Sequence, residues 1–177
     1  MQNRYRKTAM WLVAAWLIGG VVTTAAAAPS VGQPEVPPSI GQPAPEFDLT
    51  LFSGQKVALK DFRGKSVVIN FWHSMCVHCQ GEAPALEATY ERYRKSGLVI
   101  IGINIADDDE GSARAFVERY KLSFPVGHDT KGEIGSLYRV QGTDTMIFVD
   151  RAGRLADRHE GELTEAEFGQ RIEELLK

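Results

Sequence analysis

The sequence predicts an α/β domain in which helices cover both faces of a central sheet. Three apolar runs have the length and composition of buried strands: residues 66–72 (SVVINFW), 98–105 (LVIIGINI) and 145–149 (TMIFV). Segments with helical periodicity lie between and after these runs. Strands that alternate with helices along a chain assemble into a sheet with helices packed on both sides, which gives the fold class.

Shorter strand signals lie at both ends of this pattern. Residues 47–59 alternate between apolar and polar side chains about a turn at Ser53 and Gly54. We expect them to form an N-terminal β-hairpin extension that adds strands at one edge of the sheet. A turn at residues 151–154 precedes a final strand expected near residues 155–158.

Four segments have the pattern of helices with one buried face. They are residues 82–95, 112–120 and 133–140 and the C-terminal segment that follows Thr164. The first ends before Gly97, a residue that commonly terminates helices. The last begins with a capping box formed by Thr164 and Glu167, in which each side chain bonds the other residue's backbone.

Residues 1–28 have the pattern of an export signal. Arg4, Arg6 and Lys7 precede an uncharged apolar stretch that ends in small residues. This order predicts a signal peptide, cleaved after Ala27, and the stretch is also long enough to be an uncleaved N-terminal membrane anchor. Either interpretation places the rest of the chain outside the cytoplasm, for example in a bacterial periplasm. If the segment is uncleaved, it is expected to be the only membrane contact of the chain.

The remainder of the chain divides into a linker and one domain. Residues 29–45 hold six of the eight prolines, so residues 29–46 are predicted to form an extended linker before a folded domain at residues 47–177. After residue 28 the chain carries 17 basic and 23 acidic residues. This acidic balance argues against a nucleic-acid-binding protein, which would show a basic face.

Cys76 and Cys79 are the only cysteines, and they lie between a predicted strand and a predicted helix. The first turn of a helix has free N–H groups and the positive end of the dipole, and both favour a thiolate. The Cys-x-x-Cys spacing brings the two sulfurs close enough to join. His78, between them, can add a positive charge or a hydrogen-bond donor. A thiol with a lowered pKa makes the disulfide more oxidising.

A structural disulfide and a zinc site are the alternatives for this motif. A disulfide that closes so short a loop removes little entropy from the unfolded chain. One Cys-x-x-Cys motif supplies only two of the four ligands of a closed zinc site. Paired thiols at the start of a helix in an oxidising compartment are therefore interpreted as a redox-active pair.

Residues 71–84 (FWHSMCVHCQGEAP) resemble the active-site segment of TlpA/ResA-type thiol–disulfide oxidoreductases, a family of the thioredoxin-like superfamily. The resemblance continues through residues 41–47 (GQPAPEF), 59–65 (LKDFRGK), 124–126 (FPV), 138–143 (YRVQGT) and 161–163 (GEL). It implies a thioredoxin-like domain with a mixed central sheet. It also implies exchange of a Cys76–Cys79 dithiol or disulfide with protein substrates, without a bound cofactor.

The resemblance also implies roles for single residues. Cys76 would be the attacking thiol and Cys79 the resolving thiol. Glu82 matches an acidic residue that would accept the proton of Cys79, although an ordinary exposed helix glutamate is an equal alternative. Trp72 would pack beside the site. The family leans toward reduction, with a membrane electron donor restoring the dithiol and apocytochromes of cytochrome c maturation among its substrates, whereas His78 favours oxidation.

The chain departs from the family in the loop expected to face the cysteines. The family has Gly-Thr-Pro-Thr there, with a cis proline packed against the disulfide, and this chain has GTDT at residues 142–145. We expect Thr143 and Asp144 to shape this substrate loop. A non-proline cis bond costs about 2.5–4 kcal/mol, so the bond before Asp144 should be trans or strained. Its carboxylate would either raise the pKa of the Cys76 thiol or turn to solvent.

A metal-handling protein is the second function hypothesis. Without the cis proline, Cys76, Cys79 and His78 are available to bind copper or zinc, because thiolate and imidazole ligands suit Cu(I) and Zn²⁺. His73 or Asp144 would complete such a site. The acidic residues 107–110 lack the spacing of a calcium loop and are expected to cap the following helix.

Overall fold

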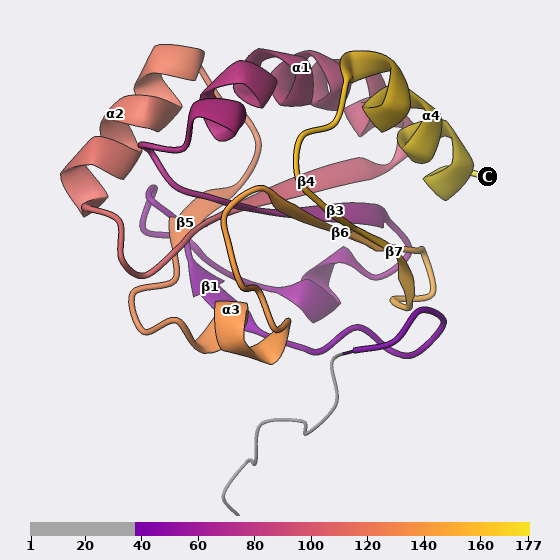
Figure 1. The fold of residues 1–177 in the computed structure, drawn as a ribbon. Coiled ribbons are helices and arrows are strands. Elements are labelled where there is room, and N and C mark those ends of the chain that lie inside the picture. Colours follow the sequence, from indigo (N-terminus) through magenta and orange to yellow (C-terminus); the bar gives the residue numbers. More distant parts are fainter. Residues whose placement is uncertain (1–37) are drawn as a thin grey trace, which may run out of the picture. The chain divides into compact units, whose positions relative to one another are not determined.

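The computed structural model describes residues 38–177, and a five-stranded mixed sheet forms its centre (Figure 1). The strand order is β5-β4-β3-β6-β7. The strands are β3 (Ser66–Trp72), β4 (Leu98–Asn104), β5 (Val126–His128), β6 (Thr145–Val149) and β7 (Leu155–Glu160). The central strand β3 pairs in parallel with β4 and antiparallel with β6. The expected mixed sheet is confirmed, and only β5 lies outside the strands predicted from sequence.

Helices cover both faces of the sheet, as the sequence predicts. They are α1 (Val77–Tyr93), α2 (Glu110–Tyr120), α3 (Glu133–Leu137) and α4 (Glu165–Leu175), with short 3-10 turns η1 (Leu59–Phe62) and η2 (Arg94–Ser96). Figure 1 shows α1, α2 and α4 over one face, and α3 with the N-terminal strands over the other. Helix α1 begins at Val77, five residues before the predicted start, because Cys76 serves as its N-cap.

The alternation of side chains along β3 builds both halves of the core. Val67 and Phe71 belong to the apolar cluster under α3 and the N-terminal strands. Val68 and Trp72 belong to the cluster under α1, α2 and α4. All seven residues of β3 are buried, which is the pattern of a central strand covered on both faces. Because β3 is covered on both faces, its carboxyl end has a fixed position in the core. Residues 73–75 connect that end to Cys76, the N-cap of α1.

The N-terminal strands differ from the expected edge addition. Strands β1 (Asp48–Thr50) and β2 (Lys56–Ala58) pair antiparallel in a separate two-stranded sheet. A single isolated β-bridge, between Leu51 and Gly127 of β5, pairs this N-terminal segment with the main sheet. A Cβ on Gly127 would lie 2.5 Å from the backbone oxygen of Thr50, so the close approach of the two segments requires glycine at this position.

The chain already contacts the domain before residue 47, the residue at which the folded domain was predicted to begin. The Gly41 N–H donates to the Leu155 carbonyl at 2.7 Å, and the Tyr138 hydroxyl donates to the Pro45 carbonyl at 2.7 Å. The predicted signal or anchor at residues 1–28, and the linker as far as residue 37, lie outside the described residues. Among residues 38–177, no helix has the length and apolar character needed to span a bilayer.

Candidate active site

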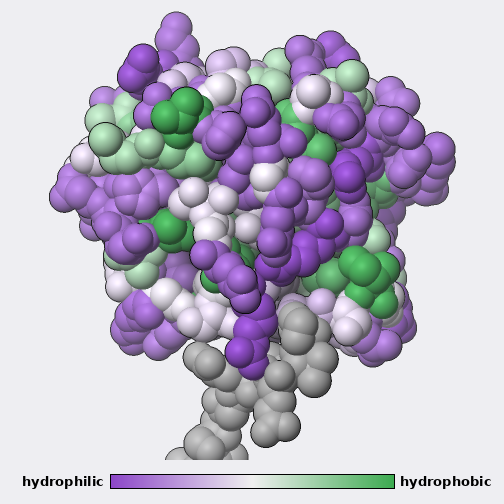
Figure 2. All heavy atoms as spheres, in the orientation of Figure 1, coloured by the Kyte–Doolittle hydropathy of each residue, from purple (hydrophilic) through white to green (hydrophobic). Residues whose placement is uncertain are grey.

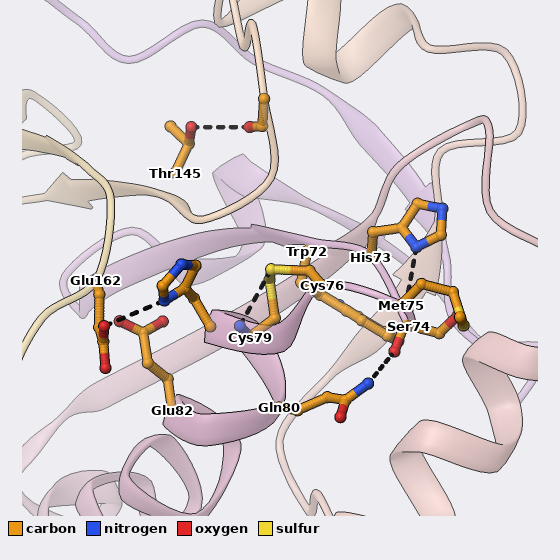
Figure 3. Close-up of a disulfide and its surroundings, with 12 residues drawn as sticks. Trp72, His73, Ser74, Met75, Cys76, Cys79, Gln80, Glu82, Thr145 and Glu162 are labelled. Atoms are coloured by element: carbon orange, nitrogen blue, oxygen red, sulfur yellow. Dashed lines mark hydrogen bonds and ion pairs between the residues drawn. A yellow bond between two sulfur atoms is a disulfide. The ribbon is translucent and has the colours of Figure 1, made fainter.

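Cys76 and Cys79 form a disulfide at the N-terminus of α1 (Figure 3). Cys76 is the N-cap residue, and its Sγ accepts a hydrogen bond from the Cys79 backbone N–H at 3.1 Å. The sulfur thus occupies the position that a capping oxygen takes at other helices. A thiolate formed at Cys76 during exchange would receive the same N–H and the positive end of the helix dipole.

The two sulfurs differ in their access to solvent. Cys79 is 5% exposed and packs in the core beneath α1, whereas Cys76 is only partly buried. Met75 and Val77, on either side of Cys76, are 75% and 76% exposed. A substrate sulfur can therefore reach Cys76 and not Cys79, and two exposed apolar side chains flank the accessible sulfur.

Asp108 organises the segment that leads from β3 to Cys76. Its carboxylate accepts hydrogen bonds from the Ser74 N–H at 2.6 Å, the Ser74 hydroxyl at 2.7 Å and the Asn104 side-chain amide at 2.7 Å. Burial acts to raise the pKa of Asp108, but the hydrogen bonds from Ser74 and Asn104 outweigh it and hold this pKa below its usual value. His73 turns toward this carboxylate, with its Nδ1 3.6 Å from Asp108 Oδ1.

Sequence analysis overlooked Asp108 because it belongs to a run of four acidic residues. Only Asp109 acts as the expected helix cap, accepting from the Ser112 N–H at 2.8 Å. The signal that could have identified Asp108 is its place just after the carboxyl end of β4, which runs parallel to β3. Ends of parallel neighbours lie side by side, so Asp108 comes to lie beside Ser74.

Trp72 belongs to the same core cluster as Cys79. Its ring is buried and stacks on Phe116 of α2, with centroids 4.4 Å apart. Its Nε1 is buried and donates no hydrogen bond within the described part of the chain. Gln80 ties the start of α1 to the preceding segment through a 2.9 Å hydrogen bond to the Ser74 carbonyl. The start of α1 is thus tied to the segment that precedes the disulfide.

Glu82 lies one helical turn after Cys79 and is 7% exposed. One carboxyl oxygen accepts a hydrogen bond from the Leu163 N–H at 2.7 Å, and the carboxyl also bonds the side chain of Asp144. Burial, followed by the contact with Asp144, raises the pKa of Glu82 to about 8, against the opposing effect of the Leu163 N–H. The interpretation of Glu82 as an ordinary exposed glutamate is therefore wrong.

Asp144 points into the protein and not to solvent. It is 5% exposed, and no peptide bond among residues 38–177 is cis. Its φ of +73° is left-handed, a conformation that Asp adopts more readily than most residues. Thr143, before it, is half-buried, and the Thr145 hydroxyl donates to the Gly142 carbonyl at 3.1 Å. The loop therefore keeps a defined shape without proline.

His78 is exposed and lies next to an acidic residue. Its Nδ1 is 3.1 Å from a carboxylate oxygen of Glu162, in the segment before α4 (Figure 3). Among the described residues, no three His, Cys, Asp or Glu side chains are grouped so that they could hold a metal ion. The copper or zinc alternative built on Cys76, Cys79 and His78 thus receives no support from the geometry.

A disulfide that caps a helix after the central strand of a mixed sheet defines a thiol–disulfide oxidoreductase of thioredoxin-like fold. The model of the AhpC/TSA family matches residues 40–158, and the chain belongs to that family. Over 138 residues it is 38% identical to the thiol-disulfide oxidoreductase ResA of Bacillus thuringiensis, covering 78% of this chain and 77% of ResA. It is 37% identical over 134 residues to the thioredoxin-like protein YneN of Bacillus subtilis, covering 75% and 78% of the two chains.

Solved structures agree with this assignment. The putative thiol:disulfide interchange protein DsbE of Chlorobium tepidum superposes with a TM-score of 0.74 at 30% identity, covering 79% of this chain and 99% of that one. A secreted disulfide oxidoreductase of Mycobacterium tuberculosis superposes with a TM-score of 0.67 at 26% identity, covering 73% and 96%. The resemblance to ResA-type oxidoreductases and the thioredoxin-like fold are both confirmed.

Proposed function

We propose that this protein is an exported protein-disulfide reductase in which Cys76 attacks and Cys79 resolves. The observation that carries these roles is the unequal access of the two sulfurs at one helix N-terminus. Cys76 thiolate would attack a substrate disulfide and form a mixed disulfide. Cys79 would then attack Cys76 Sγ, release the reduced substrate and restore the disulfide. Glu82, buried one turn after Cys79, is the proposed proton acceptor for that second step.

The charges around the disulfide support the reducing direction. His78 alone would stabilise a thiolate and favour oxidation of substrates. Its neighbour Glu162 places a carboxylate oxygen 3.1 Å from His78 Nδ1. Negative charge disfavours the thiolate, and a less stable thiolate gives a less oxidising disulfide. The effect of His78 is thus opposed by the carboxylate beside it.

The proposed location is outside the cytoplasm, with residues 1–28 as a cleaved signal or an anchor. The basic, apolar and small-residue order of that segment supports it, and one similar solved protein is described as secreted. A membrane protein that passes electrons by thiol exchange is the proposed source of reducing power, and extracytoplasmic protein disulfides are the proposed substrates. Cell fractionation with N-terminal sequencing of the mature protein tests the location and the predicted cleavage after Ala27.

Exchange of a model protein disulfide tests the roles of the two cysteines. Cys76→Ser should abolish reduction of insulin by the dithiol protein. Cys79→Ser should accumulate a covalent complex with the substrate, because no second thiol is present to release it. The two variants are matched controls for one another. Each lacks one sulfur, but only Cys79→Ser should trap the substrate. Trapping by Cys76→Ser in place of Cys79→Ser would reverse the assigned roles.

The direction is tested by the equilibrium reduction potential of the metal-free protein in glutathione buffers. A value near or below about −230 mV would support a reductant restored by a stronger thiol donor. A value near about −120 mV would mark a thiol oxidant and contradict the proposed direction.

A further inference from the structure

We propose that Asp144 is a positioning residue that shares a buried proton with Glu82, and that this proton is delivered to Cys79 when the disulfide is opened. The inference rests on the proposed function, because it concerns the same two sulfurs.

The backbone holds the Asp144 side chain in place. Its N–H donates to the Phe71 carbonyl at 3.1 Å, and its own carbonyl accepts from the Gly161 N–H at 2.8 Å. These bonds join the segment before β6 to the end of β3 on one side and to the segment after β7 on the other. The backbone of the loop is thus fixed on both sides of Asp144, and the residue is only 5% exposed.

The hydrogen bond between the two side chains requires a proton. A carboxylate only accepts hydrogen bonds, so one of the two groups must be a protonated carboxylic acid. The Leu163 N–H satisfies one oxygen of Glu82, but Asp144 Oδ1 is buried and accepts no hydrogen bond within residues 38–177. Two ionised carboxylates in so poorly solvated a site would repel one another strongly, and one shared proton relieves that repulsion.

The charged groups that act on Glu82 are both acidic, so none of them would stabilise an ionised Glu82 carboxylate. Asp144 faces it from the loop before β6, and Glu162 acts on it from the segment before α4. His78, on the same helix as Glu82, directs its ring to Glu162. Both acidic neighbours raise the pKa of Glu82. The surrounding charges therefore favour retention of the proton.

The position of Glu82 suits the transfer of a proton to Cys79. The two residues are three positions apart on α1, so their side chains share one face, with Cβ atoms about 5–6 Å apart. Both are buried, and bulk water has little access to the sulfur that must take the proton. A pKa of about 8 for Glu82 lies close to that of an ordinary thiol, and proton transfer is most effective between groups of matched pKa.

The step balances as a thiol–disulfide exchange. A donor thiolate attacks Cys76 Sγ, a donor–Cys76 disulfide forms, and the Cys76–Cys79 bond breaks with its electron pair leaving on Cys79 Sγ. The shared proton moves to that sulfur, so the charge passes from the thiolate to the carboxyl pair. In the reverse direction, Cys79 attacks the mixed disulfide as its thiol proton returns to the pair.

Titration of Glu82 in the oxidised protein tests the sharing directly. Carbon-13 NMR of glutamate-labelled protein should show a side-chain carboxyl that titrates near pH 8 and disappears in Glu82→Gln. Asp144→Asn, which tolerates the left-handed backbone, should lower that titration by about one unit or more. Asp144→Gly serves as a second variant because glycine readily adopts positive φ. Glu160→Gln, an exposed carboxylate paired with Arg158, is the matched control and should leave it unchanged.

The pH profile of disulfide opening tests the delivery. The rate constant for opening by dithiothreitol, divided by the concentration of attacking thiolate, should be constant below about pH 8 and decline above it, as the pair loses its proton. The decline should begin at lower pH in Asp144→Asn and be absent in Glu82→Gln. Unchanged titration and rate profiles in both Asp144 variants would overturn the inference while exchange itself continued. Failure of the native protein to exchange disulfides would instead contradict the proposed function.

Discussion

Two buried acidic sites flank the disulfide, and they differ in their supply of hydrogen-bond donors. Asp108, on the side of the segment before Cys76, accepts from two backbone N–H groups, a hydroxyl and an amide. Glu82 and Asp144, on the side of α4, receive one backbone N–H between them and otherwise contact one another. The exposed fractions are similar, at 8% for Asp108, 7% for Glu82 and 5% for Asp144.

The difference shows that donor supply, more than burial, decides whether a buried carboxyl keeps its proton. The pKa of Asp108 is lowered despite burial, because donors stabilise its charge. The pKa of Glu82 is raised, because burial and a second carboxyl act together against one N–H. The first site is a fixed anion that holds backbone in place. The second, one helical turn after Cys79, is the site for which we propose a shared proton.

The largest expected effect is a loss of stability with rising pH. The folded protein keeps the Glu82 proton to about pH 8, whereas the unfolded chain releases it near pH 4.5. This contribution to stability is complete below pH 4.5 and is lost as the pH rises through 8. At about 1.4 kcal/mol per unit of pKa, the free energy of unfolding should fall by roughly 4–5 kcal/mol between pH 4.5 and 9. Urea unfolding of the oxidised protein measures it.

Glu82→Gln is the matched control for that prediction. Glutamine keeps the size of the side chain and does not titrate, so this part of the pH dependence should vanish. The difference between the two curves isolates the contribution of Glu82 from that of every other titratable group. If the unfolding free energies of the native protein and the variant depended on pH in the same way, Glu82 would be ionised in the folded state. The two buried acidic sites would then not differ in protonation.

Removal of the Asp108 carboxylate should have the next largest effect. Asp108→Ala leaves the Ser74 N–H and the Asn104 amide buried without their acceptor, at a cost of roughly 2–4 kcal/mol in unfolding free energy. Exchange should also slow, because Ser74 lies in the segment that positions Cys76. Urea unfolding and insulin reduction at pH 7 measure the two effects.

Asp108→Asn separates charge from shape at this site. The amide retains one acceptor oxygen, so the loss at pH 7 should be smaller than in the alanine variant. The native contribution is present above pH 3.8 and is lost as the pH falls through the lowered pKa of Asp108. The asparagine variant should lack this acid-side loss. Native stability in the alanine variant would show that Asp108 does not hold the segment.

Strands β3 and β6 were predicted from the sequence residue for residue, because each is a continuous apolar run. Strand β5 was not, since three residues that include Gly127 and His128 carry no apolar pattern. The spacing of Cys76 and Cys79 was also sufficient to predict their disulfide at a helix start. These features depend on local sequence, and local sequence is what periodicity and motifs describe.

The two acidic sites could not be predicted in the same way. Asp144 meets Glu82 only because β6 pairs antiparallel with β3, and the two residues are far apart in the chain. Asp108 has acidic neighbours on both sides, and nothing in that run distinguishes the buried member from the helix cap Asp109. Both cases depend on strand order, which hydrophobic pattern alone leaves open.

The smallest expected effect comes from substitution of Glu162, an exposed carboxylate that can be compared with the two buried acidic sites. Its side chain and that of His78 are each 62% exposed, so their ion pair should contribute less than about 1 kcal/mol to stability. Glu162→Gln should lower the Glu82 titration slightly, because Glu162 is the weakest of the influences that raise the pKa of Glu82. It should also make the disulfide slightly more oxidising, since His78 then acts on Cys76 without an opposing charge. A downward shift as large as that in Asp144→Asn would mean that general negative charge, and not the shared proton, sets the behaviour of Glu82.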